Sequence, residues 1–139
     1  MLAASATAGT LVGFGMVRGA PAYLLNAVAH LVLGPRAQAI RGFDPVFTLG
    51  GALLHLVTLL VYGFVFASLA GRLRGSALAL AAVLFAGVAV LLDLVVLPIT
   101  LRPGFERILS APELVALYAE LALALAVGAR LFAPRAVVA

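Results

Sequence analysis

Long apolar runs separated by short basic stretches dominate the chain. Between Asp44 and Arg72 there is no charged residue over about 27 positions, and about 20 apolar residues suffice to cross the hydrocarbon core of a bilayer. Four runs predict membrane-spanning helices, at about 2–17, 46–70, 76–98 and 111–132. A shorter apolar run at about 21–34 is too brief to span, which is typical of an interfacial or re-entrant helix.

We therefore expect an all-α fold: an integral membrane four-helix bundle with a short interfacial or re-entrant helix between spans 1 and 2. The whole chain, 1–139, is expected to form a single transmembrane domain. The first run has no charge before Arg18, whereas a signal peptide has a basic start, so we expect this run to be retained as a helix.

Capping and helix-breaking residues mark the ends of these runs. Pro45 stands where the second long helix can begin, and Pro134 is expected to end the last one. Ser110 and Glu113 form the pattern of a capping box. In that arrangement the Ser110 side chain accepts from the Glu113 backbone amide while the Glu113 carboxylate reaches back.

Composition supports the lipid environment. Hydrophobic residues make up 65% of the chain and charged residues 10%, against about 25% charged residues in soluble domains. The formal charge of +4 comes from nine arginines that mostly flank the apolar runs, as loops beside membrane helices do. The predicted partner is thus the lipid bilayer and no nucleic acid. The lack of lysine indicates a GC-rich bacterial genome, and we expect a multi-pass protein of the bacterial inner membrane.

Orientation rests on one turn, because the total count of arginines on the two sides does not decide it. The basic turn 71–75 places Arg72 and Arg74 next to two helix ends, where the positive-inside rule carries most weight. We expect both termini on the cytoplasmic side.

The second long helix carries a polar stripe. Thr48, His55 and Tyr62 recur every seven residues, and Gly51 and Thr58 lie on the same face. Such a stripe faces protein or water in preference to lipid. One interpretation is a ligand-binding or proton-conducting face centred on His55, and the other is a helix interface held by interhelical hydrogen bonds.

Two acidic residues fall within later apolar runs. Asp93 and Glu120 would each be costly as isolated charges in lipid, so each is expected to be protonated or paired. Glu120 lies two turns beyond Glu113 on the same helix face, with Arg130 as a snorkelling neighbour. The predicted intramembrane polar cluster consists of His55, Thr58, Tyr62, Asp93 and Glu120.

The short helix has a polar face of its own. Tyr23, Asn26 and His30 share one side at helical spacing. We predict an interfacial polar face, and a simple water-facing surface is the alternative because such residues collect at headgroup depth.

Cofactor motifs give little support. The chain has no cysteine, no HExxH or ExxH pair and no GxSxG elbow, so we expect no metal site and no catalytic residues. The alternative is haem held axially by His30 and His55. Their predicted depths disagree, because His55 lies about 12 Å into its helix whereas His30 lies in the short run predicted to be interfacial.

The segment from Asn26 through His30, the loop Gly42–Pro45, the run Gly51–His55 and the stretch Tyr62–Ala67 is similar to part of a known group. It resembles uncharacterised small four-helix bacterial integral membrane proteins, of the domain-of-unknown-function type, with histidine in the second helix and a G-x-x-F-A ending. The resemblance implies the topology and no activity.

Three functions follow as expectations. The leading one is a non-enzymatic structural or accessory membrane component, acting as a homo-oligomer or within a larger membrane complex. The alternative is a small ion- or proton-coupled transporter that uses Asp93, Glu120 and His55. A haem-binding electron carrier comes third.

Overall fold

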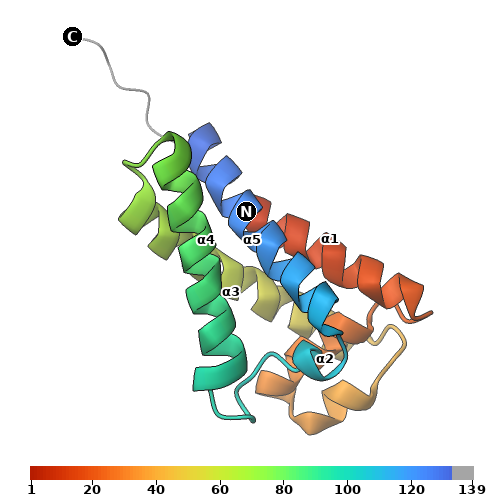
Figure 1. Cartoon of the computed structure of the whole chain (residues 1–139). Helices are drawn as coiled ribbons and strands as arrows, with labels where there is room; N and C mark the ends of the chain where they lie inside the picture. The colour runs from red at the N-terminus through yellow and green to blue at the C-terminus, as the bar shows by residue number, and fades with distance from the viewer. Residues whose placement is uncertain (133–139) are drawn as a thin grey trace.

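The computed structural model describes residues 1–132, which form helices, turns and loops without any strand. Figure 1 shows five α-helices: α1 Leu2–Val17, α2 Tyr23–Leu33, α3 Pro45–Ala70, α4 Gly75–Leu91 and α5 Ala111–Phe132. Two 3-10 turns, Pro35–Ala39 and Phe105–Arg107, and a π-helical turn, Leu92–Val96, complete the described elements. Pro134, predicted to end the last helix, lies outside the described residues.

Three helical stretches within residues 1–132 are long and apolar enough to cross a membrane: Pro45–Ala70, Gly75–Val96 and Ala111–Leu131. Helix α1 has 16 residues, or about 24 Å at 1.5 Å per residue, and falls short of a hydrocarbon core about 30 Å thick. The expected count of four spans is therefore not confirmed by helix length.

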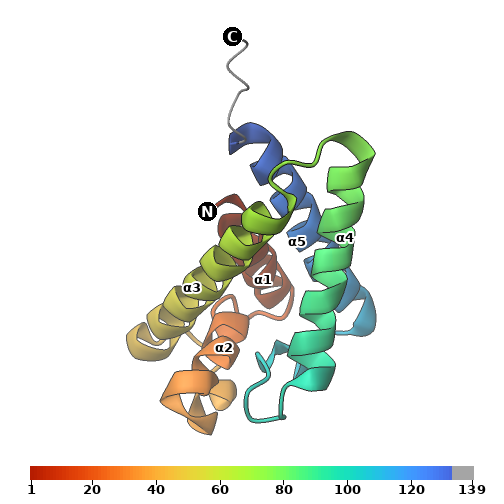
Figure 2. The same ribbon diagram turned by 90° about the vertical axis from the view of Figure 1, so that its left-hand side faces the viewer.

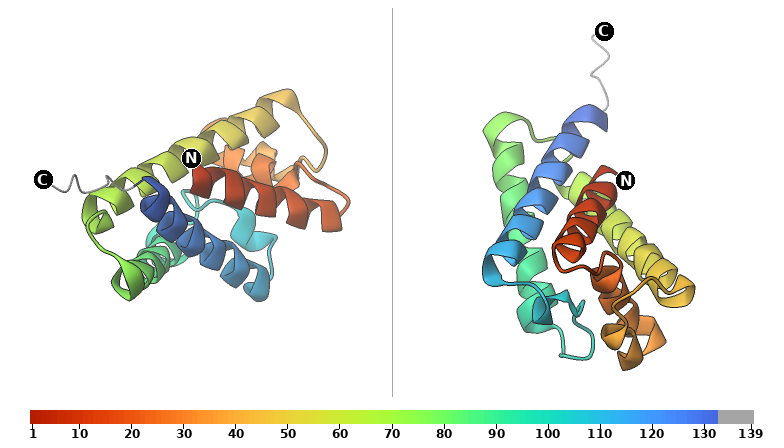
Figure 3. Two further views of the ribbon diagram at one scale, coloured as in Figure 1. Left: turned by 90° about the horizontal axis from the view of Figure 1, so that it is seen from above. Right: turned by 90° about the vertical axis from the view of Figure 1, so that its right-hand side faces the viewer.

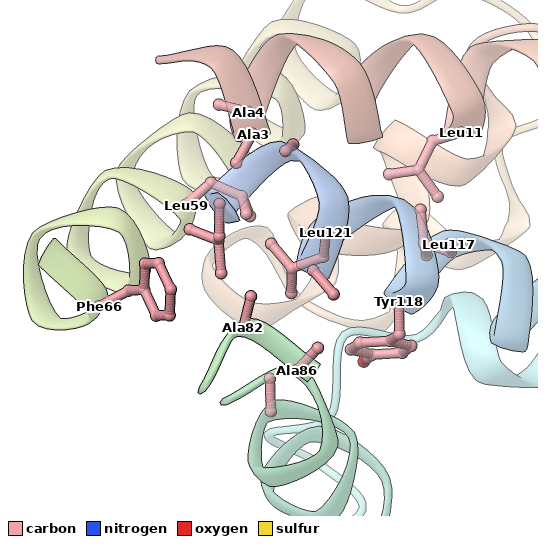
Figure 4. Close-up of a cluster of buried hydrophobic side chains, with 14 of the residues drawn as sticks. Ala3, Ala4, Leu11, Leu59, Phe66, Ala82, Ala86, Leu117, Tyr118 and Leu121 are labelled. Carbon is pink, nitrogen blue, oxygen red and sulfur yellow. The ribbon is translucent and has the colours of Figure 1, made fainter. Parts of the chain in front are cut away.

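Helix α5 lies between α1 and α4 and carries much of the core. Figure 4 shows Leu11 of α1 and Leu117 of α5 meeting on one side of α5. On its other side, Tyr118 and Leu121 project towards the small residues Ala82 and Ala86 of α4. Both alanines are buried, so the small side chains let α4 approach α5 closely.

Helix α2 is buried, and its closest partner is α3. Residues Leu24 to Ala29 are all buried, and a Cβ atom added at Gly51 would lie 1.9 Å from the Leu25 carbonyl oxygen. Only glycine permits this approach of the two backbones. Helix α2 is therefore packed inside the protein, and neither the interfacial nor the re-entrant placement that we expected is confirmed.

The hairpin of α3 and α4 opens away from its turn at 71–74. Phe85 of α4 packs edge-on against Phe66 and Tyr62 of α3, with ring centroids 5.5 and 5.8 Å apart. Further along, the two helices diverge, and α2 and the loop 97–110 occupy the end where they are farthest apart (Figure 2). Both views in Figure 3 agree that the N-terminus lies nearer the turn than α2 does.

Helix ends agree with the predicted capping in part. The Asp44 carboxylate accepts from the amides of Val46 and Phe47 at 2.9 and 3.1 Å, which starts α3 at Pro45. At α5 the Glu113 carboxylate accepts from the Ser110 amide at 2.8 Å, as expected. The Ser110 hydroxyl, however, donates to the same carboxylate oxygen at 2.7 Å and does not accept a hydrogen bond from the Glu113 amide.

Candidate functional site

Asp93 joins three helices through its two carboxylate oxygens. The Tyr62 hydroxyl of α3 donates to Oδ1 at 3.0 Å, and the Tyr118 hydroxyl of α5 donates to Oδ2 at 2.8 Å. A carboxylate has about four lone-pair sites, so two remain for another donor. The pair Asp93–Tyr62 unites two members of the predicted cluster, and Tyr118 was not predicted.

Helix direction explains how these side chains meet. Side chains on a helix lean towards its N-terminus, so Tyr62 and Tyr118 lean towards the end of the molecule that holds α2. Asp93 follows α4, which runs in the opposite direction, so its side chain leans towards the two tyrosines. It lies in the π-helical turn Leu92–Val96 that closes α4. Single π-turns of this kind often occur at functional sites.

A cavity of about 220 Å³ opens beside this carboxylate. Apolar side chains of α2, α3, α5 and the loop 97–110 form most of its wall, including Leu59, Leu117 and Leu121. The polar side chains of the wall are Thr7, His55, Thr58, Tyr62, Asp93 and Tyr118. We call this space the Asp93 cavity. Among residues 1–132, Asp93 is the one acidic residue of its wall, and no arginine lines it.

His55 is a second polar residue of the cavity wall. Its Nε2 atom lies 2.9 Å from the Thr7 hydroxyl of α1, and that hydroxyl donates to the Ala3 carbonyl at 2.8 Å. Since the Thr7 hydroxyl donates to the Ala3 carbonyl, its oxygen is the acceptor of the hydrogen bond with Nε2, and Nε2 is the protonated ring nitrogen. His55 is buried, and the bond fixes its ring at the border between α1 and the Asp93 cavity.

The loop 97–110 forms the floor. Gly104 has φ of 89°, and its open α-carbon faces the Ala27 carbonyl oxygen and the His30 ring, which a Cβ atom would meet at 3.0 and 3.1 Å. This close contact with α2 holds the buried Phe105 in the cavity wall. Leu101 of the same loop is 51% exposed, so the cavity reaches the molecular surface at the loop.

Glu106 follows Phe105 and adds a second carboxylate near the site. The Oε2 atom is buried and accepts no hydrogen bond from the described residues, while Oε1 lies 3.9 Å from Nε of Arg107. The sequence reading missed this acid because it falls in a short loop between apolar runs.

Glu120 does not belong to this cavity. Its carboxylate accepts a hydrogen bond from the Thr10 hydroxyl of α1, and it is absent from the cavity wall. Two turns earlier on the same face of α5, the Glu113 carboxylate pairs with the Arg18 guanidinium at 2.6 Å. This hydrogen bond raises the pKa of Arg18 above its ordinary value. The shared face of Glu113 and Glu120 thus binds α1, and Thr10 takes the place that we expected for Arg130.

The predicted polar face of α2 separates into three different environments. Asn26 is fully buried; its amide donates to the carbonyls of Ile40 and Gly42 at 2.8 and 2.9 Å. It also accepts from the Thr48 hydroxyl at 2.7 Å. The Tyr23 ring lies under the Arg41 guanidinium, 5.1 Å from its centroid. His30 points Nδ1 at the Ala27 carbonyl, 2.6 Å away. The water-facing alternative is wrong for Asn26, which clamps the loop 40–42.

The two histidines have different neighbours. His55 lines the Asp93 cavity beside Thr7, whereas His30 lies against Gly104 outside the cavity wall. Within residues 1–132, no group of three or more histidine, aspartate or glutamate side chains is placed to hold a metal ion.

Besides Glu106, the residues Thr7 and Tyr118 belong to the site and were not predicted from the sequence. Each is a polar side chain in an apolar helix, which is the same signal that singled out Thr58 and Tyr62. They were passed over because neither belongs to a periodic stripe. A search for every hydroxyl within an apolar run would have found them.

Comparison of the chain with protein-family models, with curated proteins and with solved structures finds no match. The proposals below therefore rest on the geometry and chemistry of the residues described above.

Proposed function

We propose that the chain is a multi-pass membrane protein that binds a small molecule in the Asp93 cavity, as a carrier or binding component, with Asp93 as the polar anchor. The observation that carries the proposal is the position of the Asp93 carboxylate. It is held by two tyrosine hydroxyls on the wall of a cavity of about 220 Å³ that also contains His55.

The cavity has the features of a ligand site. Binding pockets combine mostly apolar walls with a few convergent polar groups, and here the polar groups come from α1, α3, α5 and the π-helical turn. An engineered apolar cavity of ~150 Å³ binds benzene. A space of about 220 Å³ therefore accepts a molecule slightly larger than one six-membered ring.

The side-chain positions fit only part of the transporter hypothesis. Asp93 and His55 line one cavity, as that hypothesis requires, but Glu120 is bonded to α1. We therefore assign Glu120 a structural role and leave Asp93 and His55 as the groups that meet a ligand or proton. An acid within a membrane segment is a functional-site hypothesis by default.

We also propose a four-span topology in which α1 crosses the membrane packed against α5. The support is its contact with α5, through Thr10–Glu120 near its middle and Arg18–Glu113 at its end. The bacterial inner membrane is the location we propose, because helical spans flanked by arginine fit that membrane.

A non-enzymatic structural or accessory component, alone or in an oligomer, is the second candidate. One observation favours it: His55, Asp93 and Glu120 each have a hydrogen-bond partner inside the protein. In that case the hydroxyls serve as interhelical bonds of the kind worth about 0.6 kcal/mol on average in membrane proteins. Haem binding stays a third hypothesis, and no contact of His30 or His55 favours it.

Access to the cavity separates the first two candidates. The chain has no cysteine, so Thr58→Cys introduces a single thiol in the cavity wall at nearly constant size. The reagent is 2-hydroxyethyl methanethiosulfonate, which is small, uncharged and water-soluble, and intact mass measures its addition to the detergent-purified protein. Leu84→Cys is the control, because Leu84 lies in the middle of α4 and is 61% exposed on the outer surface that detergent covers.

A ligand cavity predicts that Thr58→Cys is modified much faster than Leu84→Cys. A closed structural cluster predicts that both thiols react equally slowly, and that result would reject the binding proposal.

A further inference from the structure

We propose that the Asp93 cavity selects a small amphipathic cation, an organic ammonium with an apolar body of about one ring. This inference rests on the proposed function and specifies its ligand class. Four observations carry it: the charge of the wall, the free acceptor sites of Asp93, the two tyrosine rings and the Glu106 Oε2 atom, which accepts no hydrogen bond from residues 1–132.

The first observation is the sign of charge around the cavity. Within the part of the chain that the structure describes, Asp93 is the one charged residue of the wall, and its oxygens accept hydrogen bonds from the two tyrosine hydroxyls. Ion pairs in the described residues are Arg18–Glu113 and Arg107–Glu106, and neither involves Asp93. Arg102 turns to the carbonyls of Leu97 and Val95 at 3.1 and 3.4 Å, where it caps the end of α4. A carboxylate without an internal cation leaves room for a cation from outside.

Glu106 adds a second carboxylate next to Phe105, which lines the cavity. Its buried Oε2 has no hydrogen-bond donor among residues 1–132, and its Oε1 lies 3.9 Å from Nε of Arg107. Two like charges near each other in a water-poor site repel, and a cation between or beside them relieves that repulsion. An anionic ligand would add to it.

The tyrosines suit the same ligand. Tyr62 and Tyr118 contribute rings as well as hydroxyls to the wall, and an ammonium near an aromatic face gains cation–π attraction. Both hydroxyl groups already donate their hydrogen bonds to Asp93. The ligand must therefore bring its own donor, which an ammonium group does. The apolar body then lies against Leu59, Leu117 and Leu121.

The test uses three probes of one shape: cyclohexylmethylammonium, cyclohexylmethanol and cyclohexanecarboxylate. Each is added to Thr58→Cys before 2-hydroxyethyl methanethiosulfonate, and protection is read as slower modification. The uncharged reagent is neither attracted nor repelled by the protein. Because the thiolate is the reacting form, each rate is compared with that of the same variant at the same pH without a probe. We expect the ammonium to protect at roughly tenfold lower concentration than the alcohol, since charge-assisted hydrogen bonds are about twice as strong as neutral ones. The carboxylate is expected to protect least.

Two further variants locate the effect. Asp93→Asn in the Thr58→Cys background is expected to abolish the preference for the ammonium over the alcohol. Glu120→Gln, which alters a membrane acid bonded to Thr10 outside the cavity, is expected to retain it. If Thr58→Cys does not fold, the unfolding temperature of the wild-type protein replaces it, because a bound ligand stabilises the folded state.

The outcomes separate the two proposals. Equal protection by alcohol and ammonium, or stronger protection by the carboxylate, overturns the cation inference and leaves the binding proposal standing. Modification of Thr58→Cys that no probe slows also overturns the cation inference. A thiol that resists modification altogether, together with an unfolding temperature that no probe shifts, overturns both.

Discussion

Tyr118 of α5 donates its hydroxyl proton to Oδ2 of Asp93 at 2.8 Å, across the boundary between α5 and the π-helical turn that ends α4. The contact connects two stretches that are also adjacent in the chain, on either side of the loop 97–110. That loop carries Phe105 and Glu106 at the floor of the cavity. The Tyr118–Asp93 bond therefore fixes the loop as well as the helices.

Removing this hydroxyl is expected to destabilise the fold. Tyr118→Phe leaves Oδ2 of Asp93 without a donor, which costs about 1–3 kcal/mol for a buried acceptor. Thermal unfolding in detergent measures the change. Tyr23→Phe is the matched control, because Tyr23 interacts with Arg41 through its ring, and its expected effect is within about 0.5 kcal/mol. Equal effects of the two variants would contradict the assigned role of Tyr118.

The crossing of α2 and α3 depends on Gly51. In Gly51→Ala the new methyl group would meet the Leu25 carbonyl at 1.9 Å, so the backbones must separate. Overpacking of this kind costs about 1–3 kcal/mol. Gly63→Ala on the same helix has nothing within 4 Å of the added carbon and is expected to be neutral or to stabilise α3 by up to about 1 kcal/mol. Circular dichroism melts of both variants test the pair, and a neutral Gly51→Ala would show that α2 lies elsewhere.

Asn26 is expected to tolerate no acidic replacement. Asn26→Asp keeps the shape but removes the amide that donates to the carbonyls of Ile40 and Gly42. A carboxylate would then face two carbonyl oxygens in a fully buried position, and unpaired buried charges cost several kcal/mol. We expect little folded protein on size-exclusion chromatography. Gln38→Glu, which alters a less buried amide nearby, provides the comparison and is expected to elute as the wild type does.

Topology is testable with single cysteines, since the chain has none. Leu2→Cys and Ser76→Cys are expected to react with a membrane-impermeant maleimide from one side of the membrane. Thr100→Cys and Ala39→Cys, at exposed sites near the other end, are expected to react from the opposite side. Labelling of intact cells against opened cells separates the two sides. If Leu2→Cys and Ala39→Cys shared one side, α1 would not cross the membrane.

The helix boundaries were accessible from sequence because they follow from run length and capping. Asp44 and Pro45 start α3 where the pattern predicts, and α1 and α5 begin and end within about one residue of expectation. The third long helix differs, since α4 ends at Leu91 and passes into a π-helical turn before Pro98. Asp93 consequently lies near the end of its span, Gly75–Val96.

The partners of the polar residues were not accessible from sequence. The apolar run around Asp93 indicates that its carboxyl group is paired or protonated. It does not identify the hydrogen-bond donors, because Tyr62 is 31 residues away and Tyr118 is 25. Which side chains reach Asp93 depends on how three helices cross. Thr10 and Glu120 are 110 positions apart, and no local pattern links them. The close approach of α2 to α3 at Gly51 likewise has no local signal in the sequence.

The most direct test of the account is an experimental structure of the wild-type protein with cyclohexylmethylammonium. The account predicts density in the Asp93 cavity, with the nitrogen within about 3 Å of an Asp93 oxygen and the ring against Leu117 and Leu121. Density elsewhere, for example in the apolar groove between Ala86 of α4 and Ala119 of α5, would contradict the assignment. An empty cavity at a concentration that stabilises the protein would contradict it equally.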